Sequence, residues 1–158
     1  MDDEKLDRIG HKYQQIAQLA HDMIPEEWER VYICGEMEEG GETIFFYYVP
    51  KGGRDSIYSL DIAGLFQIDE DEYEGMEDQL FQTMEDLWNE FKYSKQEPWS
   101  TFTMTFDKSG KFDVKHGYED LSKSGPFQRL LAFKYKYLGI VPTDDYAKTV
   151  LHEYLKGE

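Results

Sequence analysis

The segment from Trp99 to Phe106 alternates apolar and hydroxyl side chains with a period of two. Two phenylalanines and Met104 occupy every second position, and threonines stand between them. This alternation predicts a half-buried β-strand, because successive side chains of a strand point to opposite faces of a sheet. The four residues from Asp107 to Gly110 favour a tight reversal into a strand from Lys111 to His116. The two strands together predict an antiparallel hairpin.

A second hairpin is predicted earlier in the chain. The β-prone run from Arg30 to Met37 meets the turn composition Glu38-Glu39-Gly40-Gly41, and an aromatic run from Thr43 to Val49 follows. Pro50-Lys51-Gly52-Gly53 supplies another turn, after which Ser56 to Leu60 is predicted to form a short third strand. Consecutive hairpins indicate an antiparallel sheet.

Apolar residues at steps of three and four predict the helices. The first runs from about residue 3 to Ile24 and is stopped by Pro25, and the second runs from Gly75 to Tyr93. Two further helices are predicted near the end of the sequence, from Pro126 to Leu138 and from Thr143 to Leu155, with Thr143 as the cap of the last.

These elements predict the order α, β, β, β, α, β, β, α, α. The fold class is therefore α+β, with an antiparallel sheet built from hairpins and covered by helices. The 158 residues contain no internal repeat and no low-complexity linker that would divide the chain. We expect a single domain over residues 1–158.

The charge balance restricts the partners that such a chain can have. It holds 17 basic and 33 acidic residues, and the net charge of −16 repels nucleic acid backbones. Residues 1–91 hold 24 acids and 6 bases, a charge of −18, whereas residues 92–158 hold 9 acids and 11 bases, a charge of +2. Direct binding to DNA or RNA is not expected.

The acidity is concentrated between Arg54 and Lys92, where twelve acids and no basic residue occur. Such a stretch projects a negative field that attracts basic proteins, although the same acids also serve solubility. We take seven of them as candidate residues for binding a partner. They are Asp69, Glu70, Asp71, Glu72, Glu74, Asp78 and Glu85.

Signatures of catalysis and of cofactor binding are missing from the sequence. It has no glycine-rich nucleotide loop, nucleophile elbow or zinc-protease motif, and its four histidines are scattered. A calcium loop starting at Asp69 would need glycine at position six and glutamate at position twelve, where Glu74 and Leu80 stand. We predict no metal site, no cofactor and no catalytic residue. Weak cation binding by the acidic run stays open.

The compartment is indicated by the single cysteine and by the start of the chain. Cys34 has no second cysteine to pair with and is predicted to be a buried thiol within a strand. A single unpaired cysteine fits a reducing cytoplasm. The opening Met1-Asp2-Asp3-Glu4 is acidic where a signal peptide is basic and then apolar. No apolar run approaches the ~20 residues that span a bilayer. We expect a cytoplasmic protein without membrane contact.

Several short motifs resemble the YezG-like immunity proteins, also called EsaG-type antitoxins, of Gram-positive bacteria, and the resemblance spans nearly the whole chain. It rests on Ile24-Pro25-Glu26-Glu27-Trp28 with Val31-Tyr32, on Phe45-Phe46-Tyr47-Tyr48, on Trp99, on Gly110-Lys111-Phe112, and on Lys134-Tyr135-Lys136-Tyr137-Leu138-Gly139 with Pro142. The three tryptophans of the chain, Trp28, Trp88 and Trp99, are expected to anchor the core.

The resemblance implies an immunity protein that binds and neutralises the C-terminal domain of a secreted polymorphic toxin. Several such toxins carry nuclease domains, which must be positive where they grip phosphate and would suit an acidic binder. The implied partner is therefore a basic toxin domain, and the chain is expected not to be an enzyme. Two alternatives stay open: an enzyme with paired carboxylates, and a homo-oligomeric scaffold or regulatory module whose strands add edge to edge.

Overall fold

The structure is a computed structural model that describes residues 3–38, 41–94 and 97–157. Backbone contacts divide the chain into two compact units, Met1–Glu119 and Asp120–Glu158, and each unit is described by itself below. The single domain expected over residues 1–158 stays a prediction. The turn expected at Glu39 and Gly40 lies outside the described residues.

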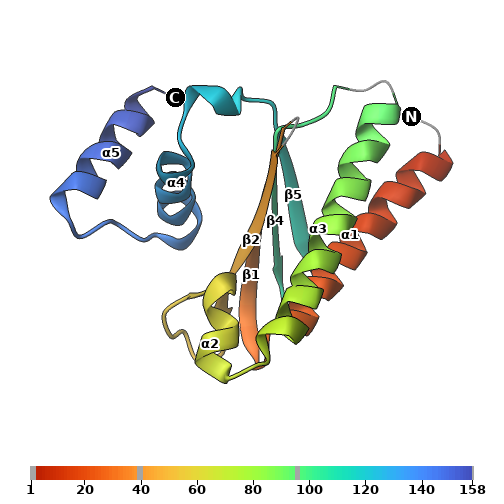
Figure 1. Ribbon diagram of the computed structural model, residues 1–158, viewed down its shortest axis with the longest axis horizontal. Coiled ribbons are helices and arrows are strands. Elements are labelled where there is room, and N and C mark those ends of the chain that lie inside the picture. Colours follow the sequence, from red (N-terminus) through yellow and green to blue (C-terminus); the bar gives the residue numbers. More distant parts are fainter. Residues whose placement is uncertain (1–2, 39–40, 95–96, 158) are drawn as a thin grey trace. The chain divides into compact units, whose positions relative to one another are not determined.

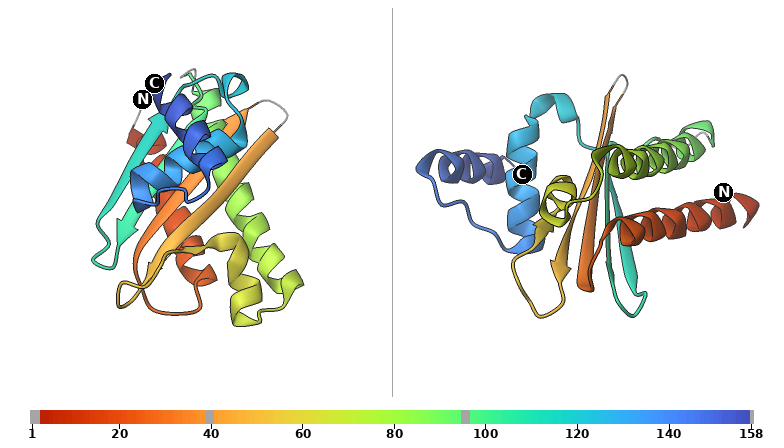
Figure 2. Two further views of the ribbon diagram at one scale, coloured as in Figure 1. Left: turned by 90° about the vertical axis from the view of Figure 1, so that its left-hand side faces the viewer. Right: turned by 60° about the horizontal axis from the view of Figure 1, so that its bottom comes forward.

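The first unit is a twisted sheet with two long helices on one face (Figures 1 and 2). Its strands follow the order β3-β2-β1-β4-β5, and every neighbouring pair is antiparallel. Helices α1 and α3 lie side by side on the same face, and the right-hand view of Figure 2 shows the sheet edge on with both helices on one side of it. The elements are α1 (Asp3–Met23), β1 (Trp28–Glu38), β2 (Gly41–Pro50), β3 (Ile57–Tyr58), the 3-10 turn η1 (Ser59–Asp61), α2 (Ile62–Phe66), α3 (Glu70–Tyr93), β4 (Thr101–Asp107) and β5 (Phe112–Gly117).

The second unit consists of the 3-10 turn η2 (Leu121–Lys123) and two helices, α4 (Pro126–Leu138) and α5 (Asp145–Lys156). The helices pack together through Leu131 and Ala132 on α4 and through Ala147 and Leu151 on α5. The predicted α+β class and the predicted order of strands and long helices are confirmed. The short helix α2 is an addition that the sequence pattern does not reveal.

Three local predictions are corrected by the structure. Helix α3 begins at Glu70 and not at Gly75, because the Asp69 carboxylate caps it by accepting a hydrogen bond from the Asp71 amide at 3.0 Å. The cap of α5 is Asp144 and not Thr143, since its carboxylate accepts from the Ala147 amide at 2.8 Å. The third strand keeps only Ile57 and Tyr58, and the chain then turns into η1.

The alternation in β4 builds the inner layer of the sheet. Phe102, Met104 and Phe106 are buried, and the threonines between them are half-buried on the other face. In register, Met104 lies opposite Ile33 of β1, which in turn lies opposite Phe46 of β2. These three side chains belong to the core beneath α1 and α3. Cross-strand apolar pairs of this kind stabilise a sheet together with the burial of its face.

Helix α3 approaches the central strand most closely at Gly35. A Cβ added to Gly35 would lie 3.3 Å from Cε of Met84, whose own side chain is 1% exposed. The absence of a side chain at Gly35 lets the Met84 side chain lie directly against the backbone of β1. This contact fixes the height at which α3 lies above the sheet.

His116 of β5 lies within an aromatic cluster at one side of the core. Its ring stacks on Trp99, with centroids 5.4 Å apart and an interplanar angle of 5°, and also contacts Phe91 and Phe102. The hydroxyl of Tyr13 lies 3.3 Å from Nε2 of His116. Burial lowers the pKa of His116 below its ordinary value of 6.5.

Replacing Gly35 with valine should destabilise the first unit by about 1–3 kcal/mol, because the new side chain would displace Met84 from the sheet. The matched control is Gly10→Val, since a Cβ at Gly10 meets nothing within 4 Å. Urea unfolding of both variants measures the effect. Equal stability of the two would contradict the close approach.

The stability contribution of His116 should depend on pH. The folded state favours the neutral ring, so above pH 6.5 the His116 ring costs no free energy of folding. As the pH falls below 6.5 and through the lower folded pKa, the unfolded state binds the proton more readily and stability is lost. In His116→Gln this loss disappears. The free-energy difference between wild type and variant should therefore shrink from about pH 8 to about pH 5, as measured by urea melts. A constant difference would contradict the argument.

Candidate partner-binding surface

Helix α3 carries acids on two of its long sides, and the side that faces α1 is neutralised. Arg8 of α1 lies 3.4 Å from a carboxylate oxygen of Glu90, and Lys12 lies 3.7 Å from one of Asp86. Asp86 and Glu90 are four residues apart and so share one face of the helix. The charges of this side are matched by the basic residues of α1.

The acids on another side of α3 have no such match. Glu74, Asp78 and Glu85 recur at steps of four and seven residues, which places them on one face. Within the described ranges, none of the three lies within ion-pair distance of a basic side chain. Glu74 and Asp78 are exposed and Glu85 is half-buried. We call these three residues the acidic face of α3.

The other four candidate residues lie at the start of the same helix. Asp69 is the cap, and Glu70, Asp71 and Glu72 form the first turn, where negative charge stabilises the helix dipole. All four are exposed. Their position in the helix gives them a role in stability whether or not they contact a partner. The seven candidates therefore lie on one element, and their part in binding stays a prediction.

Two further acids join this surface that the sequence reading missed. Partial burial, together with Glu85, raises the pKa of Glu42 on β2, and partial burial with Glu74 and Asp78 raises the pKa of Glu77 on α3. Glu77 could have been added from its position three residues after Glu74. Glu42 carries no local signal, because the strand pairing brings it to α3. Like charges gathered in this way oppose folding and leave a strong negative field.

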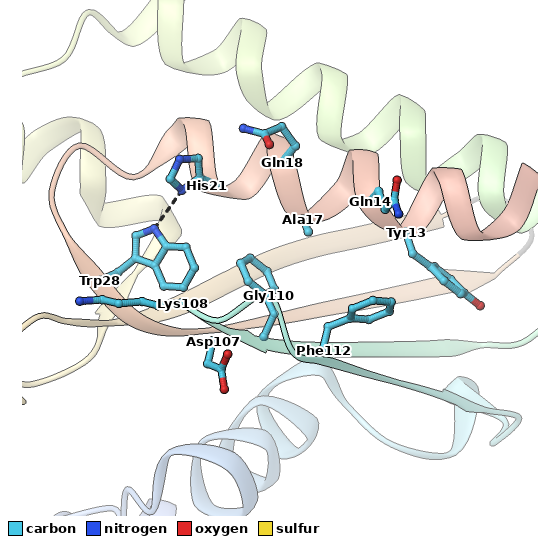
Figure 3. Close-up of a pocket in the computed structure, with 11 residues that line it drawn as sticks. Tyr13, Gln14, Ala17, Gln18, His21, Trp28, Asp107, Lys108, Gly110 and Phe112 are labelled. Atoms are coloured by element: carbon cyan, nitrogen blue, oxygen red, sulfur yellow. Dashed lines mark hydrogen bonds between the residues drawn. The ribbon is translucent and has the colours of Figure 1, made fainter.

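A groove of about 520 Å³ lies elsewhere in the first unit, between α1 and the β4–β5 hairpin (Figure 3). Tyr13, Gln14 and Gln18 line it from α1, and Phe112 lines it from β5. Asp107 also lines the groove. Hydrogen bonds from Ser109, foremost that of its hydroxyl, lower the pKa of Asp107, whereas an acid catalyst working near neutral pH needs a raised one.

Among the residues that the structure describes, no three His, Cys, Asp or Glu side chains gather to form a metal site. No helix in the described ranges is long and apolar enough to cross a membrane. Cys34 is buried in β1, as the sequence reading expected.

Comparison with known proteins identifies the family of the chain. The family model described as "Immunity protein YezG-like" matches residues 9–152. The chain belongs to the YezG-like immunity protein family. It is 32% identical over 151 residues to the immunity protein YezG of Bacillus spizizenii, covering 94% of each chain. It is also 32% identical over 146 residues to the type VII secretion system protein EsaG of Staphylococcus aureus, covering 91% of this chain and 88% of EsaG.

A second Bacillus relative, the immunity protein YezG of Bacillus subtilis, is 29% identical over 145 residues, covering 90% of this chain and 96% of that protein. The family match and the relatives' names support an immunity-protein role that includes a protein partner. The expected family is thereby confirmed.

The family motifs that the sequence reading singled out serve the fold. Tyr48 donates a hydrogen bond of 2.6 Å to Glu26, which also pairs with Arg54. Partial burial opposes ionisation of Glu26, yet these two hydrogen bonds and the Arg54 charge lower its pKa. Trp28 packs against the core and donates to Nδ1 of His21 at 3.1 Å. Trp99 is 1% exposed and Trp88 packs beside it, so the expected core role of the tryptophans is confirmed.

Glu85→Gln should stabilise the protein at neutral pH, because it removes the charge that disfavours ionised Glu42. The folded pKa of Glu42 is raised above its ordinary 4.5, so the penalty appears as the pH rises through that folded value and is absent below 4.5. The melting temperature of the variant should exceed that of wild type at about pH 7 and match it at about pH 4. A stabilisation that does not change with pH would contradict this.

Proposed function

We propose that this chain is an antitoxin that acts in the cytoplasm and neutralises the C-terminal domain of a secreted polymorphic toxin by binding it. The partner surface is basic, as the substrate groove of a nuclease is, and the chain contributes binding and no catalysis. The family membership and the names of the relatives support the immunity role.

One observation carries the proposal. On the side of α3 that faces α1, two acids pair with Arg8 and Lys12. The acidic face of α3 has no basic partner among the described residues. Solubility alone requires net charge but not the concentration of unpaired charge on one side of one helix. An external cationic surface would supply the missing counter-charge.

The physical gain from such a surface is chiefly in rate and selectivity. Opposite potentials accelerate encounter and orient the partner before contact, and this effect is screened by salt. A nuclease domain presents positive potential where it holds phosphate, so an acidic binder competes for that surface. Binding of this kind inhibits without any catalytic group.

The triple variant Glu74→Gln, Asp78→Asn and Glu85→Gln tests the acidic face of α3. These residues are preferred over Glu70, Asp71 and Glu72, whose removal would also weaken the start of the helix. We expect the dissociation constant for a catalytically inactivated domain of the toxin encoded beside this chain to rise about tenfold or more at low salt. The salt dependence of association should also become weaker. Stopped-flow association at two salt concentrations measures both.

The matched control removes three exposed charges elsewhere in the first unit, as Asp7→Asn, Asp22→Asn and Asp113→Asn. The control and the acidic-face variant have the same net charge and differ only in where the charges are removed. The control should therefore bind within about twofold of wild type. Equal losses in the two variants would mean that total charge, and not the acidic face of α3, drives association. Absence of binding by the wild-type chain to the toxin domain would overturn the proposed function.

A further inference from the structure

The segment from Ser59 to Phe66, which forms η1 and α2, exposes large apolar side chains beside the acidic helix. Leu60 is 58% exposed, Leu65 is 62% exposed and Phe66 is 36% exposed. Single exposed apolar residues are ordinary on a protein surface, but three within one short segment of a charged chain need an explanation. We call these three side chains the apolar corner.

The apolar corner is held rigidly by the residues between its members. Ile62 is fully buried, and the Ser59 hydroxyl accepts a hydrogen bond from the Phe46 amide at 3.1 Å. Gln67 ends α2 in the left-handed region at φ 56°, and the Ile68 amide donates to the Ala63 carbonyl at 2.9 Å. The three apolar side chains are therefore exposed from an ordered support.

The same support joins the apolar corner to the start of α3. The Tyr73 hydroxyl of α3 donates a buried hydrogen bond of 2.7 Å to the Ser59 carbonyl. Burial comes first among the causes that raise the pKa of Tyr58, and the charges of Asp61 and Glu77 add to it. Acids from η1 and from α3 thus lie around one tyrosine beside the corner. Figure 1 shows α2 leading directly into α3.

We propose that the apolar corner is the anchor with which this chain holds a basic protein partner, so that Leu60, Leu65 and Phe66 enter an apolar recess whose rim is cationic. The inference rests on the proposed function and locates the anchoring contact of that same interface. Charge complementarity identifies the partner, because the chain from residue 55 to residue 91 holds twelve acids and no base. A neutral or acidic surface would leave those charges unmatched.

This arrangement divides the work of binding between two kinds of contact. Buried apolar anchors at the centre of an interface carry most of the binding energy and slow dissociation. Charged residues around them change the association rate and its dependence on salt. The two contributions therefore leave separate kinetic signatures.

The double variant Leu65→Ser with Phe66→Ser tests the anchor against the inactivated domain of the toxin encoded beside this chain. We expect the dissociation constant to rise about tenfold or more through faster dissociation, by the same factor at low and high salt. The control is Leu6→Ser with Tyr93→Ser, which replaces side chains 53% and 77% exposed at other places in the first unit. It should bind within about twofold of wild type.

A second measurement uses the unmodified protein. In the complex, the amides of residues 59–68 should exchange with deuterium more slowly than in the chain alone. Wild-type affinity in the double variant, or unchanged exchange of the amides of residues 59–68 in the complex, would overturn the anchor. The proposed function would still stand if the wild-type chain binds and the acidic-face variant loses binding. Failure of the wild-type chain to bind would overturn both.

Discussion

The packing of α3 on the sheet is the interaction on which the rest of the structure depends. Gly35 leaves room for Met84, and Leu80, Leu87 and Phe91 extend the same buried stripe. Once this stripe faces the strands, the helical period fixes where every other α3 residue lies. One side meets the basic residues of α1, and another presents Glu74, Asp78 and Glu85, which have no counter-charge within ion-pair distance among the described residues. The location of the proposed binding surface is thus a consequence of how the core is packed.

The surface also has an energetic cost within the fold. Glu42 and Glu77 have raised carboxyl pKa values because burial and neighbouring carboxylates disfavour their ionised forms. A chain selected for stability alone would place a basic residue among them. A protein that binds a basic partner instead leaves these negative charges unmatched until the partner brings the positive counter-charge. Under the proposed function, stability in isolation and affinity for the partner therefore oppose each other along α3.

The sequence predicted the parts of the fold that have a strong local period. The alternation of β4 and the apolar stripe of α3 each determine an element from adjacent residues, so the class and the order could be predicted. The start of α3 was placed too late because its first turn is wholly acidic and carries no apolar period, although the capping Asp69 was a usable signal. Apolar residues in a sequence are ordinarily taken for core, so Leu65 and Phe66 gave no sign of their exposure.

The candidate site was predictable only in part. The acidic run could be predicted directly, but the pairing of Asp86 and Glu90 by α1 and the approach of Glu42 to Glu85 arise from contacts between distant segments.

The most direct test of the account is co-expression of this chain with the active toxin domain encoded beside it, scored by cell growth. The account predicts restored growth and a complex that dissociates more readily at high salt. Continued killing of cells in which this chain is present and folded would contradict it.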